Sequence, residues 1–195
     1  ATLTMSALKY GDTLSIGSKG YTIGITIGNL HAAMGNLVTN CKLTINGTEY
    51  TIKDKDNNED PSEISLDTAK ALVSDGAKVT FGTQNYVAMT DKDNNGIGDN
   101  DASIISAQKA YKLIAEELRV ASSIGTDPGK EAKNLTAAKN DYATASEYKT
   151  GCTQVSFAID EGEVKTKQGL QLGLHVGADA DENNKIAFTM DTMTS

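Results

Sequence analysis

The sequence predicts an α+β protein with an antiparallel sheet, built from repeated β-hairpin-plus-helix units and closed by C-terminal strands. Three segments with one common pattern support this prediction: residues 13–23, 42–52 and 78–88. Each has an alternating strand, a turn that contains Gly, and a second alternating strand led by Tyr. A helical pattern follows each hairpin. Because such helices can cover one face of a sheet, we expect a layered fold.

The middle segment carries the clearest turn signal, Asn46-Gly47. A type I′ turn needs positive φ at both central residues, which Asn and Gly tolerate. Hairpins with Gly turns are common, so the shared pattern alone has a second reading as coincidence. The second and third segments, however, both run on into Asp-Lys-Asp-Asn-Asn, at 54–58 and 91–95. This repeated pentapeptide favours an internal duplication.

Four segments have helical periodicity. The strongest begins at Ser103 and ends at Ser122, because its apolar residues recur at steps of three and four. That apolar face contains Ile104, Ala107, Tyr111, Ile114 and Leu118. The expected helices cover residues 29–38, 65–74, 103–122 and 130–145, the last opening after Asp127-Pro128.

Strand alternation returns at residues 153–159 and again in the tail. Two apolar runs alternate there on either side of a polar, acidic stretch at residues 177–184, which predicts strand, exposed loop and strand. The runs are Leu170, Leu172, Leu174 and Val176, then Ile186, Phe188 and Met190. We therefore expect residues 1–150 to form the outer domain or domains with the hairpin–helix repeats, and residues 151–195 to form the C-terminal strands.

Composition excludes several classes of function. The net charge is −8 and Arg119 is the single arginine, whereas phosphate contacts need clustered Lys and Arg, so we expect no nucleic-acid partner. There is no run of 18 apolar residues, so we expect no membrane insertion. The N-terminus lacks a basic region followed by an apolar stretch, so no signal peptide is visible; an excised chain would look the same. The hydrophilic, turn-rich profile is typical of exported bacterial surface proteins.

Cysteine and histidine offer little chemistry. Cys41 and Cys152 lie far apart and outside any C-x-x-C motif, which leaves two alternatives, buried thiols or a disulfide that closes a long loop. His31 and His175 could activate a thiol only as close neighbours, and nothing local orients such a pair. No catalytic or nucleotide-binding fingerprint is present. We therefore expect no enzyme activity and no required cofactor.

Residues 91–101 are similar to calcium loops, both of EF-hands and of thrombospondin type-3 repeats. Calcium takes six to eight oxygen ligands, and alternating acidic residues around a tight glycine turn at Gly96 can supply them. The candidate ligands are Asp91, Asp93, Asn95, Ile97 through its carbonyl, Asp99 and Asp101. Ala102 stands where these families place a bidentate carboxylate. The alternative is a solvated acidic turn that leads into the helix at Ser103.

The related stretch at residues 54–60 has Glu59 at the position of the turn glycine, and Pro61 follows soon after. It lacks the backbone freedom that a calcium loop needs, so we interpret it as a decayed copy or a plain loop.

The tail resembles a stretch of bacterial flagellins, in which the variable outer region re-enters the conserved filament core. In residues 169–193 the matching positions are Leu170, Gln171, Val176, Gly177, Ala178, Ile186 and Met193. The resemblance covers only this closing hairpin. It implies that the chain is the variable, solvent-facing region of a flagellin, outside the cell on the filament surface.

The resemblance also implies partners. Other flagellin subunits would be bound through core segments that this chain lacks, and a host surface or a glycan is a further candidate ligand. The implied role is structural: the region would decorate the filament and set its charge, antigenicity and adhesion. The alternative from the residues themselves is a calcium-stabilised bacterial adhesion module of the cell surface.

Overall fold

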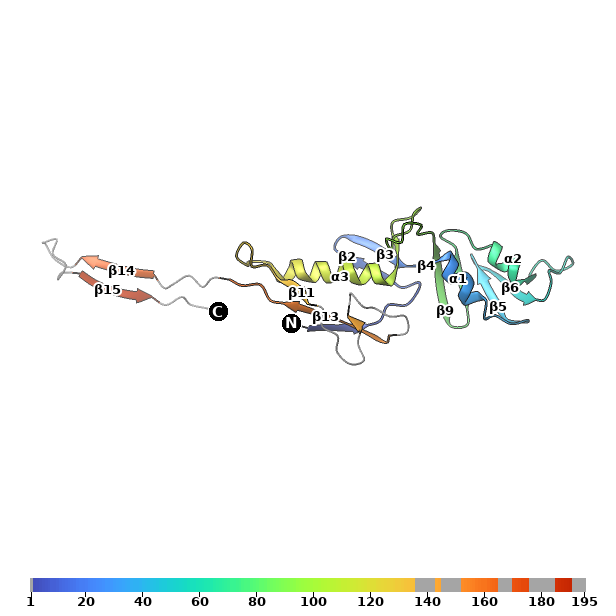
Figure 1. The fold of residues 1–195 in the computed structure, drawn as a ribbon, viewed down its shortest axis with the longest axis horizontal. Coiled ribbons are helices and arrows are strands. Elements are labelled where there is room, and N and C mark those ends of the chain that lie inside the picture. The colour runs from blue at the N-terminus through green and yellow to red at the C-terminus, as the bar shows by residue number, and fades with distance from the viewer. Residues whose placement is uncertain (1, 136–142, 145–151, 165–169, 176–184, 191–195) are drawn as a thin grey trace.

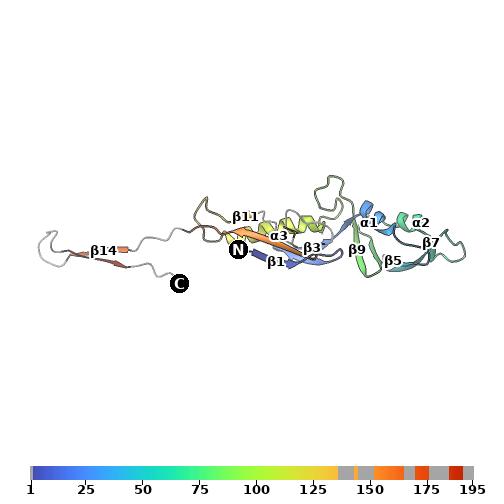
Figure 2. The ribbon, with the colours of Figure 1, turned by 60° about the horizontal axis from the view of Figure 1, so that its bottom comes forward.

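A computed structural model describes residues 2–135, 143–144, 152–164, 170–175 and 185–190. The fold is α+β, with mainly antiparallel sheets and few helices, as the sequence predicts. Two lobes follow one another along the long axis in Figures 1 and 2. We call residues 25–90 the distal lobe. We call residues 2–24, 104–135, 143–144 and 152–164 the body.

The elements alternate between the lobes in chain order. The body begins with β1 (Thr2–Ser6), β2 (Thr13–Ile16) and β3 (Lys19–Ile23). The distal lobe contains β4 (Ile25–Thr26), α1 (Ile27–Met34), β5 (Lys42–Ile45), β6 (Thr48–Lys53), β7 (Glu63–Ser65), α2 (Leu66–Ala71), β8 (Lys78–Phe81) and β9 (Gln84–Met89). The body then resumes with β10 (Ile104–Ile105), α3 (Ala107–Ser122), β11 (Lys133–Leu135), β12 (Ala143–Thr144) and β13 (Gln154–Asp160).

The three predicted hairpins are present as β2–β3, β5–β6 and β8–β9. Asn46 and Gly47 have φ of 51° and 87°, which confirms the predicted turn with positive φ at both residues. A tight turn precedes each hairpin, and its third residue donates its N–H to the end of the second strand. These bonds are Gly11 to Ile23 (2.8 Å), Asn40 to Ile52 (2.7 Å) and Gly76 to Ala88 (2.9 Å). The shared bonds show that the three segments are structural repeats.

Each hairpin is completed by a short parallel strand that leads directly into a helix. The strands β4, β7 and β10 end beside N-cap residues whose hydroxyls accept from the backbone N–H three residues on. The caps are Thr26 (3.4 Å), Ser65 (3.2 Å) and Ser106 (3.1 Å). These hydroxyls satisfy N–H groups that the first helical turn leaves free, so a cap fixes each helix start.

Only the middle unit is completed by its own strand. β7 pairs in parallel with β6 of the same unit. By contrast, β4 follows the first hairpin and pairs with β9 of the third, whereas β10 follows the third hairpin and pairs with β3 of the first. The first and third units have therefore exchanged their strand–helix pairs. The result is a distal sheet in the order β4-β9-β8-β5-β6-β7.

Gly24 is the crossing point of this exchange. It is the single residue between β3 and β4, and its N–H donates to the Ile105 carbonyl at 2.9 Å. An added Cβ would lie 2.4 Å from Ile104 Cγ2 and 3.3 Å from the Val87 carbonyl oxygen. The exchanged strand β10 therefore passes too close to this backbone for a side chain, and β9 lies at a tight distance on the other contact.

Each lobe has its own apolar core. The distal core contains Leu30, Leu43, Ile52 and Val79 beneath α1 and α2. In the body, α3 runs along one side of the strands (Figure 1) and its Tyr111 packs with residues such as Ile23, Val155 and Phe157. β13, which follows the boundary expected at residue 150, thus shares a core with the N-terminal half.

β1 and β13 are antiparallel neighbours in the body, with Thr2 opposite Ala158 and Ser6 opposite Gln154. β1 therefore begins at the same end of the molecule at which β13 ends. The tail forms a separate two-stranded sheet of β14 (Leu170–His175) and β15 (Lys185–Met190), with Leu172 opposite Phe188. This confirms both predicted tail strands. Val176 and the predicted loop at 177–184 lie outside the described residues.

One helix prediction is wrong and two others need new bounds. The helix expected at 130–145 is wrong, because residues 133–135 form β11 and residues 143–144 form β12, both paired with β13; residues 136–142 and 145 are outside the description. The spacing of apolar residues in this segment favours a helix, but strand pairing with β13 overrides that local preference. The helix expected from Ser103 starts instead at Ala107, since Ile104 and Ile105 pair with β3. The helix expected at 29–38 is α1, shifted to 27–34.

Replacing Gly24 with Ala should destabilise the protein by about 1–3 kcal/mol, because the new methyl group overpacks a crossing that cannot widen. Urea denaturation measures this change in the free energy of unfolding. Gly20→Ala is the matched control, since a Cβ there meets no atom within 4 Å. Equal stability of the two variants would contradict the assigned role of Gly24.

Candidate metal site

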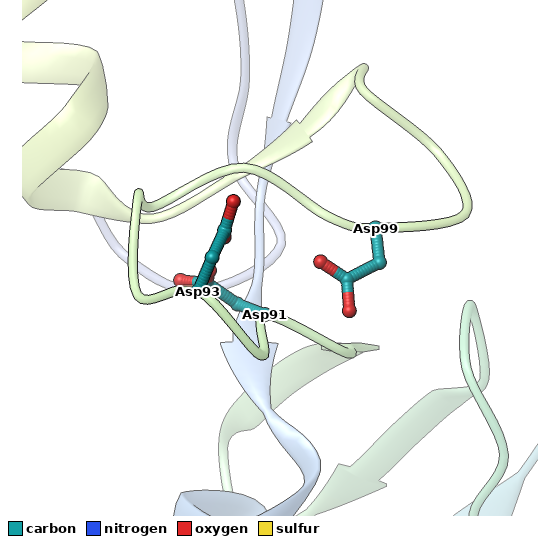
Figure 3. Close-up of side chains that lie close together, drawn as sticks. All are labelled: Asp91, Asp93 and Asp99. Carbon is teal, nitrogen blue, oxygen red and sulfur yellow. The ribbon is translucent and has the colours of Figure 1, made fainter.

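Three of the predicted ligands lie together on the loop that leads from the distal lobe to the body. Asp91, Asp93 and Asp99 each offer a carboxylate oxygen, and these oxygens lie within 4.8 Å of one another (Figure 3). Two ligands of one calcium ion can be no further apart than twice the Ca–O distance of 2.3–2.6 Å. The spacing of these carboxylates fits that limit. Within the described part of the chain, no second group of His, Cys, Asp or Glu side chains comes as close together.

The loop is held in shape by its own hydrogen bonds. The Asp91 carboxylate accepts from the N–H groups of Asn95 and Gly96, both at 3.0 Å. Asn95 Oδ1 accepts from the Ile97 N–H at 2.7 Å. Asp99 is brought back towards Asp91 because its N–H donates to the Thr90 carbonyl (2.7 Å) and its carboxylate accepts from the Lys92 N–H (3.2 Å). These hydrogen bonds bring the Asp91 and Asp99 carboxylates close together.

Gly96 explains how the chain turns at this point. Its φ of +81° lies in the left-handed region, which glycine adopts without the steric cost that a Cβ brings. A Cβ would also lie 2.7 Å from Ser106 Oγ, the N-cap hydroxyl of α3. The Gly96 carbonyl accepts from the Ser106 N–H at 2.8 Å. The loop and the start of α3 are therefore one packed unit.

The other predicted ligands are used differently. Asp101 Oδ1 accepts from the Ser103 N–H (2.8 Å) and hydroxyl (2.6 Å), so this carboxylate is turned to the backbone ahead of β10. The Ser103 hydroxyl, followed by its N–H, holds the pKa of Asp101 below its usual range. The side-chain oxygen of Asn95 already accepts a hydrogen bond from the Ile97 N–H. Ile97 itself packs against the body core.

Electrostatics favour a cation at the three carboxylates. Two unit charges 4–5 Å apart repel by about 1 kcal/mol in a water-like dielectric, and more where the site is partly shielded. Asp93 and Asp99 are exposed, so water screens part of this repulsion. Calcium needs six to eight oxygens, so the three carboxylates would need bidentate binding, carbonyls or water to complete a coordination shell.

Asp75 is a supporting residue that the sequence does not single out. Its carboxylate accepts from the Thr90 N–H (2.5 Å) and hydroxyl (2.6 Å), directly before Asp91. The Thr90 hydroxyl is the main reason why the pKa of Asp75 lies below its usual value. Asp75 therefore ties the first residue of the loop to the turn that precedes β8. Its partner is 15 residues away, so no local motif reveals the contact.

In the related loop at residues 54–62, which we call the sister loop, the carboxylates accept hydrogen bonds from neighbouring residues. Asp56 matches Asp93 in the repeated pentapeptide, but it accepts from the Ser65 N–H (2.6 Å) and the Thr68 hydroxyl (2.7 Å) at the start of α2. The Ser65 N–H and then the Thr68 hydroxyl lower the pKa of Asp56. Asp60 accepts from Ser62, as Asp101 does from Ser103. The duplicated loops share the turn before the parallel strand and differ at the carboxylate cluster.

Cys41 and Cys152 are free and partly exposed, so the expectation of two buried thiols is wrong and no disulfide joins them. No helix in the described residues is both long enough and apolar enough to cross a membrane.

No family model, curated protein or solved structure matches this chain.

Calcium should raise the melting temperature if Asp91, Asp93 and Asp99 bind it, because a ligand of the folded state alone adds about 2.7 kcal/mol at 100 times its Kd. Thermal melts with calcium and with chelator measure this shift. The double variant Asp93→Asn, Asp99→Asn should lose it. Asp56→Asn, the matched change in the sister loop, should keep it; a calcium shift that survives in the double variant would contradict the site.

Acid should destabilise the fold through Asp56, Asp60 and Asp101. Hydrogen bonds lower the pKa of each in the folded state, so each stabilises the protein above its unfolded pKa of about 3.9. That stabilisation is lost as the pH falls through the lowered folded pKa. Asp56→Asn should therefore flatten the acid limb of the melting-temperature profile below about pH 4.

Proposed function

We propose that this chain is the variable, outward-facing region of a bacterial flagellin, with a structural role on the filament surface. The observation that supports this best is the pairing of β1 with β13. Because these strands are antiparallel neighbours, the chain enters and leaves the body at one end. An outer region that interrupts a polymer-forming trunk needs this arrangement, since both of its connections lead to the same stalk.

The tail is the second support. β14 and β15 pair along their whole length, from Leu170 opposite Met190 to His175 opposite Lys185. Two paired strands at this position agree with the resemblance to the segment where flagellins re-enter the filament core. The subunit contacts of a filament would then lie in trunk segments outside this chain.

The elongated shape and the charge suit display. The distal lobe lies at the opposite end of the folded region from the Thr2 end of β1 (Figure 2). It would therefore extend from the filament and meet antibodies, host surfaces or glycans first. A net charge of −8 would keep neighbouring filaments soluble and apart.

Antibodies raised against the purified chain should label flagellar filaments along their full length in immunogold electron microscopy of the bacterium that encodes it. A strain without the gene is the control, and it should show no label. Gold on the cell wall with bare filaments would contradict the flagellin proposal.

A calcium-stabilised adhesion module of the cell surface is the second candidate. The cluster of Asp91, Asp93 and Asp99 favours it, since calcium bridges in this loop would stiffen the connection between the lobes. The immunogold experiment separates the two functions by location. The thermal melts with calcium and with chelator separate the two functions by their dependence on calcium. An adhesion module of this kind should lose many degrees of melting temperature in chelator.

A further inference from the structure

The exchange between the first and third units divides the chain into two closed parts. Every strand of the distal sheet comes from residues 25–90, and both of its edge strands, β4 and β7, lead into helices of the same lobe. The first hairpin, β2–β3, is completed by β10 and α3, which belong to the body. The boundary between the lobes therefore falls at Gly24 and at the beginning of the loop at 91–103.

The link after each hairpin explains this division. In the middle unit, residues 54–62 give β7 enough chain to return beside β6 and pair in parallel. Parallel neighbours need such a crossover, because the second strand must restart at the same end as the first. Gly24 alone cannot make that return. β4 therefore continues into the next lobe, and the place beside β3 is filled by a strand from later in the chain.

That later strand is β10, and the loop that precedes it supplies the crossover that the first hairpin lacks. The loop at 91–103 resembles 54–62: Ser103 and Ser62 both donate to an aspartate two residues earlier. Their carbonyls accept from matching strand residues, Thr22 and Thr51, both at 2.8 Å. If Gly24 ran directly into Asp91, the order would be hairpin, loop, strand and helix, as in the middle unit.

We infer that residues 25–90 are an inserted lobe that folds and unfolds as a unit of its own, and that its removal leaves the body closed. The inference rests on strand register and link length, and it does not depend on the proposed function. The body keeps its own core around Ile23, Tyr111 and Phe157. The junction at Gly24 and Asp91 is then a place where whole lobes can be removed or replaced.

The lobes touch through a small contact that an inserted lobe can lose. Tyr10 of the body packs against Tyr86, with ring centroids 5.5 Å apart, and its carbonyl accepts from Gln84 Nε2 at 3.1 Å. Val87 and Met89 of the distal lobe meet Ile104 in a separate small cluster. No strand ladder between described residues crosses from one lobe to the other.

Native-state hydrogen exchange on the full chain tests the inference. Leu43 is 1% exposed in the distal core, and Phe157 is 3% exposed in the body core. Leu43→Ala should lower protection of the β5, β6, β8 and β9 amides by at least about 30-fold and leave β13 and α3 unchanged. In the matched variant Phe157→Ala, protection should fall in the body. An equal loss in both lobes from Leu43→Ala would overturn the inference.

A deletion of residues 25–90, which joins Gly24 to Asp91, provides a second measurement. The Thr22 and Gly24 amides donate to the Ser103 and Ile105 carbonyls, at 2.8 and 2.9 Å, and so report the pairing of β3 with β10. Both amides should stay slow to exchange in the deletion variant. A variant that is unfolded, or that is folded with these two amides unprotected, would show that the body needs the distal lobe.

Discussion

The architecture depends on one steric constraint, the crossing at Gly24. There the chain passes from the body to the distal lobe within hydrogen-bonding distance of the strand that returns from it, and a Cβ would fall 2.4 Å from Ile104. Because a single residue cannot reverse the chain, the first hairpin must take its third strand from elsewhere. The exchange, the two separate cores and the elongated shape all follow from this short link.

Sequence reasoning succeeded where the signal was local. Period-two alternation and Asn46-Gly47 located the hairpins, and the pentapeptide at 54–58 and 91–95 pointed to the duplication. It failed where partners were distant. Ile104 fits the face of a helix by spacing, yet it pairs with Thr22, and residues 133–135 pair with β13. No local pattern could reveal the exchange of strands, since β4 and β10 each pair with a hairpin that is distant in the sequence.

The candidate metal site also combines features that the sequence predicts with features that it does not. The spacing of Asp91, Asp93 and Asp99 was visible in the sequence, and the structure brings these carboxylates together. Asp101 has the same residue type and looks equivalent in the sequence, but its carboxylate accepts hydrogen bonds from the Ser103 N–H and hydroxyl. The comparison of Asp56 with Asp93 shows why motifs alone mislead. Asp56 accepts hydrogen bonds from the start of α2, whereas the equivalent Asp93 lies close to two other carboxylates.

The adjacency of β1 and β13 has a mechanical consequence. If both connections led to one stalk, as the proposed function requires, a pull on the distal lobe would load both strands in the same direction. The load is therefore shared between two neighbouring strands and does not slide one past the other. A separating force applied to the two tethered ends would act differently, because it would peel the ladder open one hydrogen bond at a time, starting at Thr2 and Ala158. The β1–β13 ladder therefore resists a pull that both strands share better than a pull that separates them.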